Sequence, residues 1–295
     1  MSITATQNPR RLAALHDLIQ QLRLEQLDDH RFRGGNIDIG SPSVFGGQVL
    51  GQALMAAART VPTQAVHSLH GYFLRAGDKA SPIDYQVDAV RDGASFSMRR
   101  VVALQHGGPI FHMSASFHRS EPGVDHQREM PVTLPPEGLQ DEHEARLALR
   151  DRLPEAARAV VDQARAIDIR PVEPLDMFAP EPRPPANQTW MRAHGPLPDD
   201  PLIHQALLAY ASDFSLLLVA MRPHGLTFMQ PQVQCVSLDH AMWFHRDFRF
   251  DDWLLYETDS PSATGARGFC RGNLFSRDGR LVASVAQEGL IRLRR

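Results

Sequence analysis

The sequence is poor in cysteine, lysine and aromatic side chains. Cys235 and Cys270 are the only cysteines among 295 residues and both fall in strand-like segments, so neither a disulfide framework nor a cysteine-rich metal site is expected. Lys79 is the only lysine, aromatic residues make up 7%, and the net charge is −3. This composition lacks the basic, aromatic-rich character of nucleic-acid-binding proteins. We therefore predict no metal ion, no other cofactor and no nucleic-acid partner.

Targeting segments are also lacking. Residues 1–29 are polar, with a weak helical pattern from Arg11 to Leu27 and without the apolar core of a signal peptide. The longest apolar run, His204–Met221, carries Gln, Ser, Asp and Tyr, which favours a buried helix over a membrane span. The last residues, Arg292-Leu-Arg-Arg295, are not the peroxisomal tripeptide. We expect a cytoplasmic protein with no membrane span.

Composition divides the chain into three stretches. Residues 1–118 and 187–295 each contain a helical pattern followed by strand-like segments, and residues 119–186 read as a linker with helical fragments at Glu142–Asp151 and Glu155–Ala166. The expected helices are Gly46–Arg59 and His204–Met221. The expected strands are Val66–Arg75, Ile83–Arg91, Ser95–Gln105, Pro109–His118, Gln232–Phe244, Trp253–Thr258, Ala266–Ser276 and Leu281–Leu293.

The two outer stretches look like a diverged internal repeat. Gln52-Ala-Leu54 matches Gln205-Ala-Leu207 within the two helices, and an offset of 170 residues pairs His70 with His240. One helix wrapped by a long antiparallel sheet is the α+β pattern of a hotdog fold. We therefore predict a double hotdog of two tandem units, each with a central helix, and we expect catalysis in the second.

Asp213 is the only carboxylate in the run His204–Met221. A helical period places it on one face with Ala206, Tyr210, Leu217 and Ala220. An ionised carboxylate on such an apolar face is costly unless it is paired or hydrogen-bonded, which favours a catalytic acid or base. An N-cap or an exposed acid is the alternative. The helix of the first half contains no acidic residue.

Two further differences separate the halves. The offset of 170 places Phe117 opposite Gln287 and His67 opposite Ser237. The second half has thus gained an acid, a hydroxyl and an amide, which can converge beside the central helix. Taken singly, Ser237 fits an ordinary strand serine and Gln287 fits a residue that satisfies a strand edge.

Several long motifs resemble the acyl-CoA thioesterase II (TesB-like) family. They follow one another in the family's order, from about Leu24 onward, and the likeness is weakest in the middle of the chain. The motifs are Val44-Phe-Gly-Gly-Gln-Val-Leu-Gly-Gln-Ala-Leu54, Val66-His-Ser-Leu-His-Gly-Tyr-Phe-Leu-Arg75, Arg91-Asp-Gly-Ala-Ser-Phe-Ser-Met-Arg-Arg100, Tyr210-Ala-Ser-Asp-Phe214, Leu238-Asp-His-Ala-Met-Trp-Phe-His245 and Val282-Ala-Ser-Val-Ala-Gln-Glu-Gly289.

The resemblance implies a double hotdog that hydrolyses acyl-CoA to fatty acid and CoA. Its catalytic Asp, Thr and Gln fall on Asp213, Ser237 and Gln287. Ser237 departs from the usual threonine but keeps the hydroxyl, which can donate and accept a hydrogen bond. We expect Asp213 to activate a water molecule, with Ser237 and Gln287 orienting it.

The remaining expectations concern substrate and assembly. Gly46-Gly47, at the start of the first helix, and the start of the Asp213 helix are both candidates for the oxyanion donors. We also expect Gly46, Gly47 and His67 to bind substrate, and His67 is the competing candidate for the base. The expected partner is a fatty acyl-CoA of medium to long chain. Resemblance to the family implies a homodimer or homotetramer.

Other functions remain open. A non-catalytic acyl-CoA-binding regulator fits the same fold, although loss of the acid would mark that class and Asp213 is present. A hydratase or dehydratase of the hotdog fold would need an Asp/His or Glu/His pair within its own motif, which the sequence does not show. A serine hydrolase of the α/β type is disfavoured because there is no Gly-x-Ser-x-Gly sequence.

Overall fold

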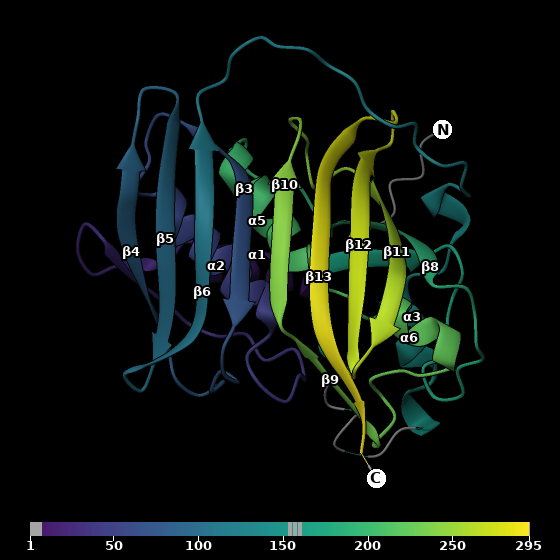
Figure 1. Cartoon of the computed structure of the whole chain (residues 1–295). Helices are drawn as coiled ribbons and strands as arrows, with labels where there is room; N and C mark the ends of the chain where they lie inside the picture. The colour runs from purple at the N-terminus through teal and green to yellow at the C-terminus, as the bar shows by residue number, and fades with distance from the viewer. Residues whose placement is uncertain (1–7, 153–154, 156–157, 159–160, 295) are drawn as a thin grey trace.

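The structure is a computed structural model that describes residues 8–152, 155, 158 and 161–294. Within these residues thirteen strands form one antiparallel sheet (Figure 1). The strands are β1 (Glu25–Gln26), β2 (Arg31–Gly34), β3 (Ala65–Phe73), β4 (Ile83–Asp92), β5 (Phe96–Gln105), β6 (Gly108–His118), β7 (Ile167–Pro171), β8 (Ala186–Ala193), β9 (Val233–Ser237), β10 (Asp239–Phe244), β11 (Leu254–Thr264), β12 (Arg267–Ser276) and β13 (Leu281–Leu293). The helices are α1 (Pro9–Leu22), α2 (Gly46–Ala58), α3 (Glu142–Ala148), α5 (Pro201–Ser212) and α6 (Leu218–Met221).

The two halves join edge to edge in the middle of this sheet. β3 of the first half pairs with β10 of the second, with Tyr72 opposite Asp239 and Ser68 opposite Trp243. The two expected sheets therefore form one surface, in the order β1-β2-β4-β5-β6-β3-β10-β13-β12-β11-β8-β7, with β9 paired to the end of β13. The predicted α+β hotdog class is confirmed.

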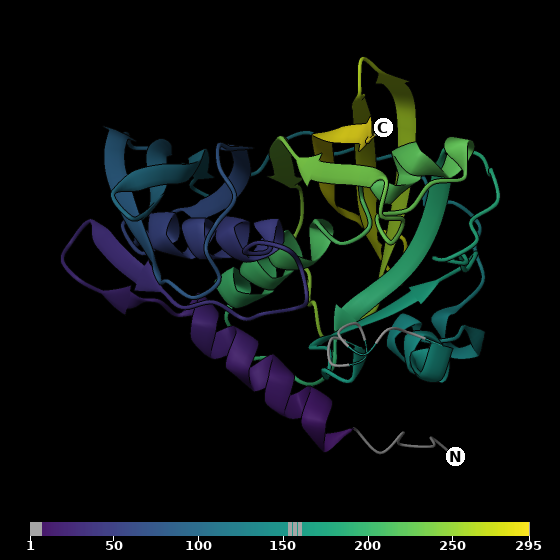
Figure 2. The same ribbon diagram turned by 90° about the horizontal axis from the view of Figure 1, so that it is seen from below.

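Both central helices lie on the same face of the sheet and pack against each other (Figure 2). Apolar residues predominate on all sides of α2, and every residue from Gly47 to Ala57 is buried. Glycine allows the close approach: a Cβ at Gly47 would lie 2.2 Å from the carbonyl oxygen of Tyr210 in α5. This packing sets the first turn of α2 beside the last turn of α5.

The segment 119–186, predicted as a linker, is not all loop. Its residues Ile167–Pro171 form β7, which pairs with β8 and extends the sheet of the second half. α3 lies within the expected fragment Glu142–Asp151, and part of the fragment Glu155–Ala166 lies outside the described residues.

A buried ionic cluster ties this segment to the N-terminal helix. Arg11 of α1 forms an ion pair of 2.7 Å with Asp168 and one of 3.4 Å with Asp141, the N-cap of α3. His194 Nδ1 lies 2.6 Å from the same Asp168 carboxylate. These groups fix α1, α3 and β7 to one another.

The predicted helix His204–Met221 is wrong in its second half. α5 ends at Ser212, and Asp213 is its C-cap, with φ −80° and ψ −13°. Ser215 then adopts a left-handed backbone with φ 61°, and helical structure resumes only at α6. Leu217 and Ala220 therefore do not share a helix face with Asp213. The run contains no Gly or Pro to signal this break.

Among the described residues no helix has the length and apolar character needed to cross a membrane.

Candidate active site

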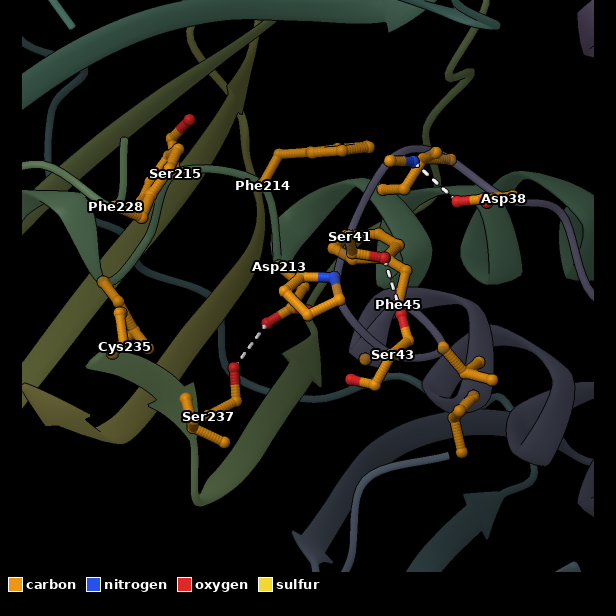
Figure 3. Close-up of a pocket in the computed structure, with 18 of the residues that line it drawn as sticks. Asp38, Ser41, Ser43, Phe45, Asp213, Phe214, Ser215, Phe228, Cys235 and Ser237 are labelled. Carbon is orange, nitrogen blue, oxygen red and sulfur yellow. Dashed lines mark hydrogen bonds between the residues drawn. The ribbon is translucent and has the colours of Figure 1, made fainter. Parts of the chain in front are cut away.

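A cavity of about 1110 Å³ lies between the two halves. Its walls come from the loop before α2, the end of β3, the break between α5 and α6, and β9, and Asp213 and Ser237 are both on its surface (Figure 3). Apolar side chains predominate, and the lining residues also include Arg75, Arg146, Arg165 and Arg294. An apolar cavity with a few convergent polar groups is the usual form of a small-molecule site.

One oxygen of the Asp213 carboxylate is held by two side chains. Gln287 Nε2, on β13, donates to Asp213 Oδ1 at 2.7 Å and to Ser237 Oγ at 3.1 Å. The Ser237 hydroxyl, at the end of β9, donates to the same Oδ1 at 3.4 Å. The Asp213 side chain is only 5% exposed. These hydrogen bonds hold the carboxylate in one orientation.

The second oxygen, Oδ2, points toward the start of α2. A Cβ built on Gly46 would lie 2.8 Å from it, so only glycine leaves the carboxylate its place. Within the part of the chain that the structure describes, no residue donates a hydrogen bond to Oδ2. One oxygen is thus anchored and the other is available to a reactant.

The first turn of α2 has no side-chain cap, unlike the first turns of α1, α3 and α5. Asn8, Asp141 and Asp200 cap α1, α3 and α5 through side-chain oxygens, whereas Phe45 caps α2 with no side-chain hydrogen bond. The first N–H groups of a helix have no partner within it. Those of Gly46 and Gly47 have no acceptor among the described residues, and Gly46 lies next to Asp213.

Three aromatic rings lie over this site. Phe45 stacks on Phe214 with ring centroids 4.6 Å apart, and the Tyr210 ring meets both edge-on, at 5.2 and 5.4 Å. All three line the cavity. They give the cavity an apolar wall beside the carboxylate.

Comparison with known proteins decides the family. The family model described as acyl-CoA thioesterase matches residues 161–290, and the model of the acyl-CoA thioesterase N-terminal domain matches residues 35–118. The chain is 40% identical to acyl-CoA thioesterase 2 of Haemophilus influenzae over 94% of this chain and 98% of that protein. It is 44% identical to human acyl-coenzyme A thioesterase 8 over 92% of this chain and 88% of the human protein.

The chain belongs to the acyl-CoA thioesterase II (TesB) family. The predicted family and the predicted enzyme class, an acyl-CoA thioesterase, are confirmed. Among solved structures, TesB2 of Mycobacterium marinum is 44% identical, with a TM-score of 0.76 over 93% of this chain and 97% of that one. The tesB protein of Mycobacterium avium subspecies paratuberculosis is 32% identical, with a TM-score of 0.78 over 94% and 99%.

His67, predicted to bind substrate, lies elsewhere in this thioesterase. Its Nε2 is 2.8 Å from Ser116 Oγ on β6, and its ring contacts Phe96 and His118. It is not among the residues that line the cavity. Burial and the nearby His118 lower the pKa of His67. The structure brings together Asp213, Ser237, Gln287 and Gly46, but not His67. Gly47 packs against Tyr210 and Phe45 and is not among the residues that line the cavity.

Cys235 also lines the thioesterase cavity, two residues before Ser237. Burial, and then the charge of Asp213, raise the pKa of its thiol to about 11. The thiolate, and not the thiol, is the nucleophilic form of cysteine. Cys235 is therefore part of the wall and not a nucleophile at neutral pH.

One residue of the site was missed in the sequence. His240, on β10, is fully buried, and its Nδ1 lies 3.8 Å from Asp213 Oδ1. Its Nε2 lies 3.0 Å from Ser212 Oγ. Burial lowers the pKa of His240, although Asp213 and then Asp239 oppose this effect. A signal was present, because His240 alternates with Met242 and Phe244, which are all buried on one face of β10.

Proposed function

We propose that this thioesterase hydrolyses fatty acyl-CoA of medium to long chain by direct attack of water, with Asp213 as the general base. The observation that carries this proposal is the asymmetry of the carboxylate. Oδ1 is held by Gln287 and Ser237, while Oδ2 lies beside Gly46, the first residue of α2, where a Cβ would be only 2.8 Å away. A base and oxyanion donors side by side are what thioester hydrolysis by water requires.

In the first step the oxygen of water attacks the thioester carbonyl carbon. As the new C–O bond forms, the water O–H bond breaks and its proton passes to Asp213 Oδ2. The carbonyl oxygen becomes an oxyanion, which accepts hydrogen bonds from the N–H groups of Gly46 and Gly47. The positive end of the α2 dipole adds to this stabilisation.

In the second step the intermediate collapses. The electron pair on the oxyanion re-forms the carbonyl, the C–S bond breaks, and the sulfur of CoA leaves as a thiolate. The proton on Asp213 then returns to the thiolate, directly or through solvent. Ser237 and Gln287 keep the carboxylate aligned throughout, and no acyl-enzyme is formed.

Cavity size supports a long acyl group. Pockets for small ligands have volumes of roughly 300–1,000 Å³, and this cavity, at about 1110 Å³, lies above that range. Arg75 and Arg165 border it and have no carboxylate among the ion pairs of the described residues, so they are candidates to contact CoA phosphates.

The function is tested by release of free thiol from butanoyl-, octanoyl- and palmitoyl-CoA. We expect steady turnover that is faster with the two longer substrates. Tight binding of all three without thiol release would favour the acyl-CoA-binding regulator instead. Release from butanoyl-CoA alone would contradict the proposed chain length.

A hydratase or dehydratase is the second candidate, because Asp213 and His240 do form an Asp/His pair. In such an enzyme both groups must reach the substrate. His240 is fully buried behind Asp213 and does not line the cavity, so only the carboxylate is accessible. The hydrolase is therefore the better reading of the same pair.

For the assembly we propose a homodimer or homotetramer formed through the outer face of the sheet. At its centre, where His70 pairs with Ser114 and Ala241, small side chains and aromatic rings predominate. Light scattering on the purified chain should give the mass of at least two copies, and Ala241→Arg should reduce it. A wild-type mass of one copy would refute this assembly. Cytoplasmic location remains our prediction, to be tested by fractionation.

A further inference from the structure

His240 connects the end of α5 to the catalytic carboxylate, from the side away from the cavity. The imidazole is 0% exposed. Nε2 lies 3.0 Å from Ser212 Oγ, and Nδ1 lies 3.8 Å from Asp213 Oδ1. Because Ser212 and Asp213 are consecutive residues, one ring contacts both. Nδ1 has no hydrogen-bond partner among the described residues, and it lies within ion-pair distance of the carboxylate.

The path of the chain gives this ring its orientation. Residues 237 and 240 would lie on opposite faces of a regular strand. The chain steps out of register at Leu238, between β9 and β10, where the N–H of Leu238 bonds to the carbonyl of Glu288. Ser237 and His240 can therefore both face Asp213.

The contacts of Ser212 allow either tautomer of His240, and the Asp213 carboxylate favours one of them. The hydroxyl lies 2.9 Å from the Ala209 carbonyl oxygen and 3.0 Å from His240 Nε2, and its single proton can go to either. A bare Nδ1 would direct a lone pair at the Asp213 carboxylate in a dry environment, where such repulsion is strong. With the proton on Nδ1 and the Ser212 hydroxyl donating to Nε2, the ring instead directs an N–H dipole at the carboxylate.

Charged groups around the ring are few. Asp213 faces it from the end of α5, and Asp239 precedes it on β10 with its carboxylate oxygen bonded to the N–H of Glu288. The Tyr256 hydroxyl, on β11, donates to the carbonyl of Ser212 and not to the imidazole. Desolvation lowers the pKa of His240 despite the two carboxylates, so the ring is neutral in the working range.

We propose that His240 is a positioning residue for the general base: its neutral imidazole, oriented by Ser212, directs the Nδ1–H dipole at Asp213 Oδ1 and keeps the carboxylate ionised and aligned. This inference rests on the proposed role of Asp213. It adds a third group, after Gln287 and Ser237, to the support of Oδ1. At 3.8 Å the contact is electrostatic and not a short hydrogen bond.

Two variants separate this role from simple packing. In His240→Asn the side-chain amide can place an N–H near the position of Nδ1, whereas in His240→Gln it reaches the position of Nε2 and offers nothing to Asp213. The measurement is kcat/KM for octanoyl-CoA as a function of pH. A carboxylate that loses a donor binds its proton more readily, so the acid limb of the profile should move to higher pH.

For His240→Gln we expect the acid limb to rise by about half a pH unit or more, with a plateau roughly tenfold lower. For His240→Asn we expect the limb within about 0.2 pH unit of wild type. A limb that does not move in His240→Gln, or that moves equally in both variants, would overturn the proposal. If neither variant folds, Ser212→Ala decides: a smaller shift to higher pH supports the proposal and an unchanged limb refutes it.

Failure of the proposed function is a separate outcome. If Asp213→Asn turned over substrate at near-native rate, the base itself would be wrong, whatever the His240 variants did. If Asp213→Asn is inactive and the acid limb of the kcat/KM profile stays unchanged in the His240 variants, only the positioning role of His240 fails.

Discussion

Replacing Gly46 by alanine should damage catalysis without damaging the fold. The new Cβ would lie 2.8 Å from Asp213 Oδ2 and 3.0 Å from the Phe73 ring. Ordinary contact begins near 3.4 Å, so the carboxylate must move by about 0.6 Å. A misplacement of 1 Å at a catalytic group can cost about 10²-fold in rate. We therefore expect kcat/KM to fall about 10- to 100-fold.

Stability should respond differently. Alanine is favoured over glycine within a helix by up to about 1 kcal/mol, which offsets part of the contact with the Phe73 ring. The free energy of unfolding of Gly46→Ala should thus stay within about 1 kcal/mol of wild type. The two assays are thiol release from octanoyl-CoA and urea denaturation followed by circular dichroism.

Two other glycines provide controls. In Gly47→Ala the Cβ would lie 2.2 Å from the backbone oxygen of Tyr210. This oxygen cannot move without the backbone of α5, so we expect a loss of stability of about 1–3 kcal/mol. Gly138 has nothing within 4 Å of the position that an alanine Cβ would occupy, so Gly138→Ala should change neither property. Wild-type kcat/KM in Gly46→Ala would refute the tight placement of Oδ2 on which the proposed mechanism depends.

The remaining predictions concern the support of the base and the buried ion cluster. Ser237→Ala and Gln287→Ala should each lower kcat by about 10- to 100-fold. This loss is smaller than the one expected for Asp213→Asn, because Ser237 and Gln287 position the carboxylate and do not accept the proton. A larger loss in either variant than in Asp213→Asn would contradict these roles. Desolvation alone would raise the pKa of Asp168, but the hydrogen bond from His194 and the charge of Arg11 hold that pKa below its usual value. The ionised Asp168 carboxylate therefore stabilises the folded protein fully at pH values above its unfolded-state pKa, near 4. This stabilisation is lost as the pH falls through the folded-state pKa of Asp168. Asp168→Asn should lower the free energy of unfolding at pH 7 by about 3–5 kcal/mol, and the difference from wild type should shrink in acid; a constant difference at all pH values would refute this reasoning.

Most strands of this protein are predictable from sequence because their alternation is regular. The predicted strand Gln232–Phe244 is wrong, because it is divided at Leu238 into β9 and β10, and β11 continues beyond the predicted end at Thr258 to Thr264. β13 has the predicted bounds, Leu281–Leu293, and β4 to β6 begin and end within one residue of prediction. The junction of β3 with β10 was not predicted, because a helix–strand pattern does not say which edges of two sheets meet. The sequence thus predicts the two hotdog halves but not the strand pairing that joins them.

Around the candidate site, prediction failed where the backbone is irregular. Asp213 was singled out by the apolar residues around it in the sequence. Its place at the C-terminal end of α5 was not predicted, because the helix breaks before Ser215, whose left-handed backbone has no glycine to signal it. His240 was missed because it was weighed only as a metal ligand, and the sequence does not show that it lies beside Asp213. The change of register at Leu238 lets Ser237 and His240 face the same side of the sheet, and the alternation of apolar residues does not reveal it.

The most direct test of the proposed mechanism is Asp213→Asn. The amide keeps the size of the carboxylate and removes its ability to accept a proton. We predict that kcat for thiol release from octanoyl-CoA falls by about 10²–10⁴-fold, while the circular dichroism spectrum and the urea midpoint stay near wild type. A folded Asp213→Asn variant with near-native turnover would show that Asp213 is not the base.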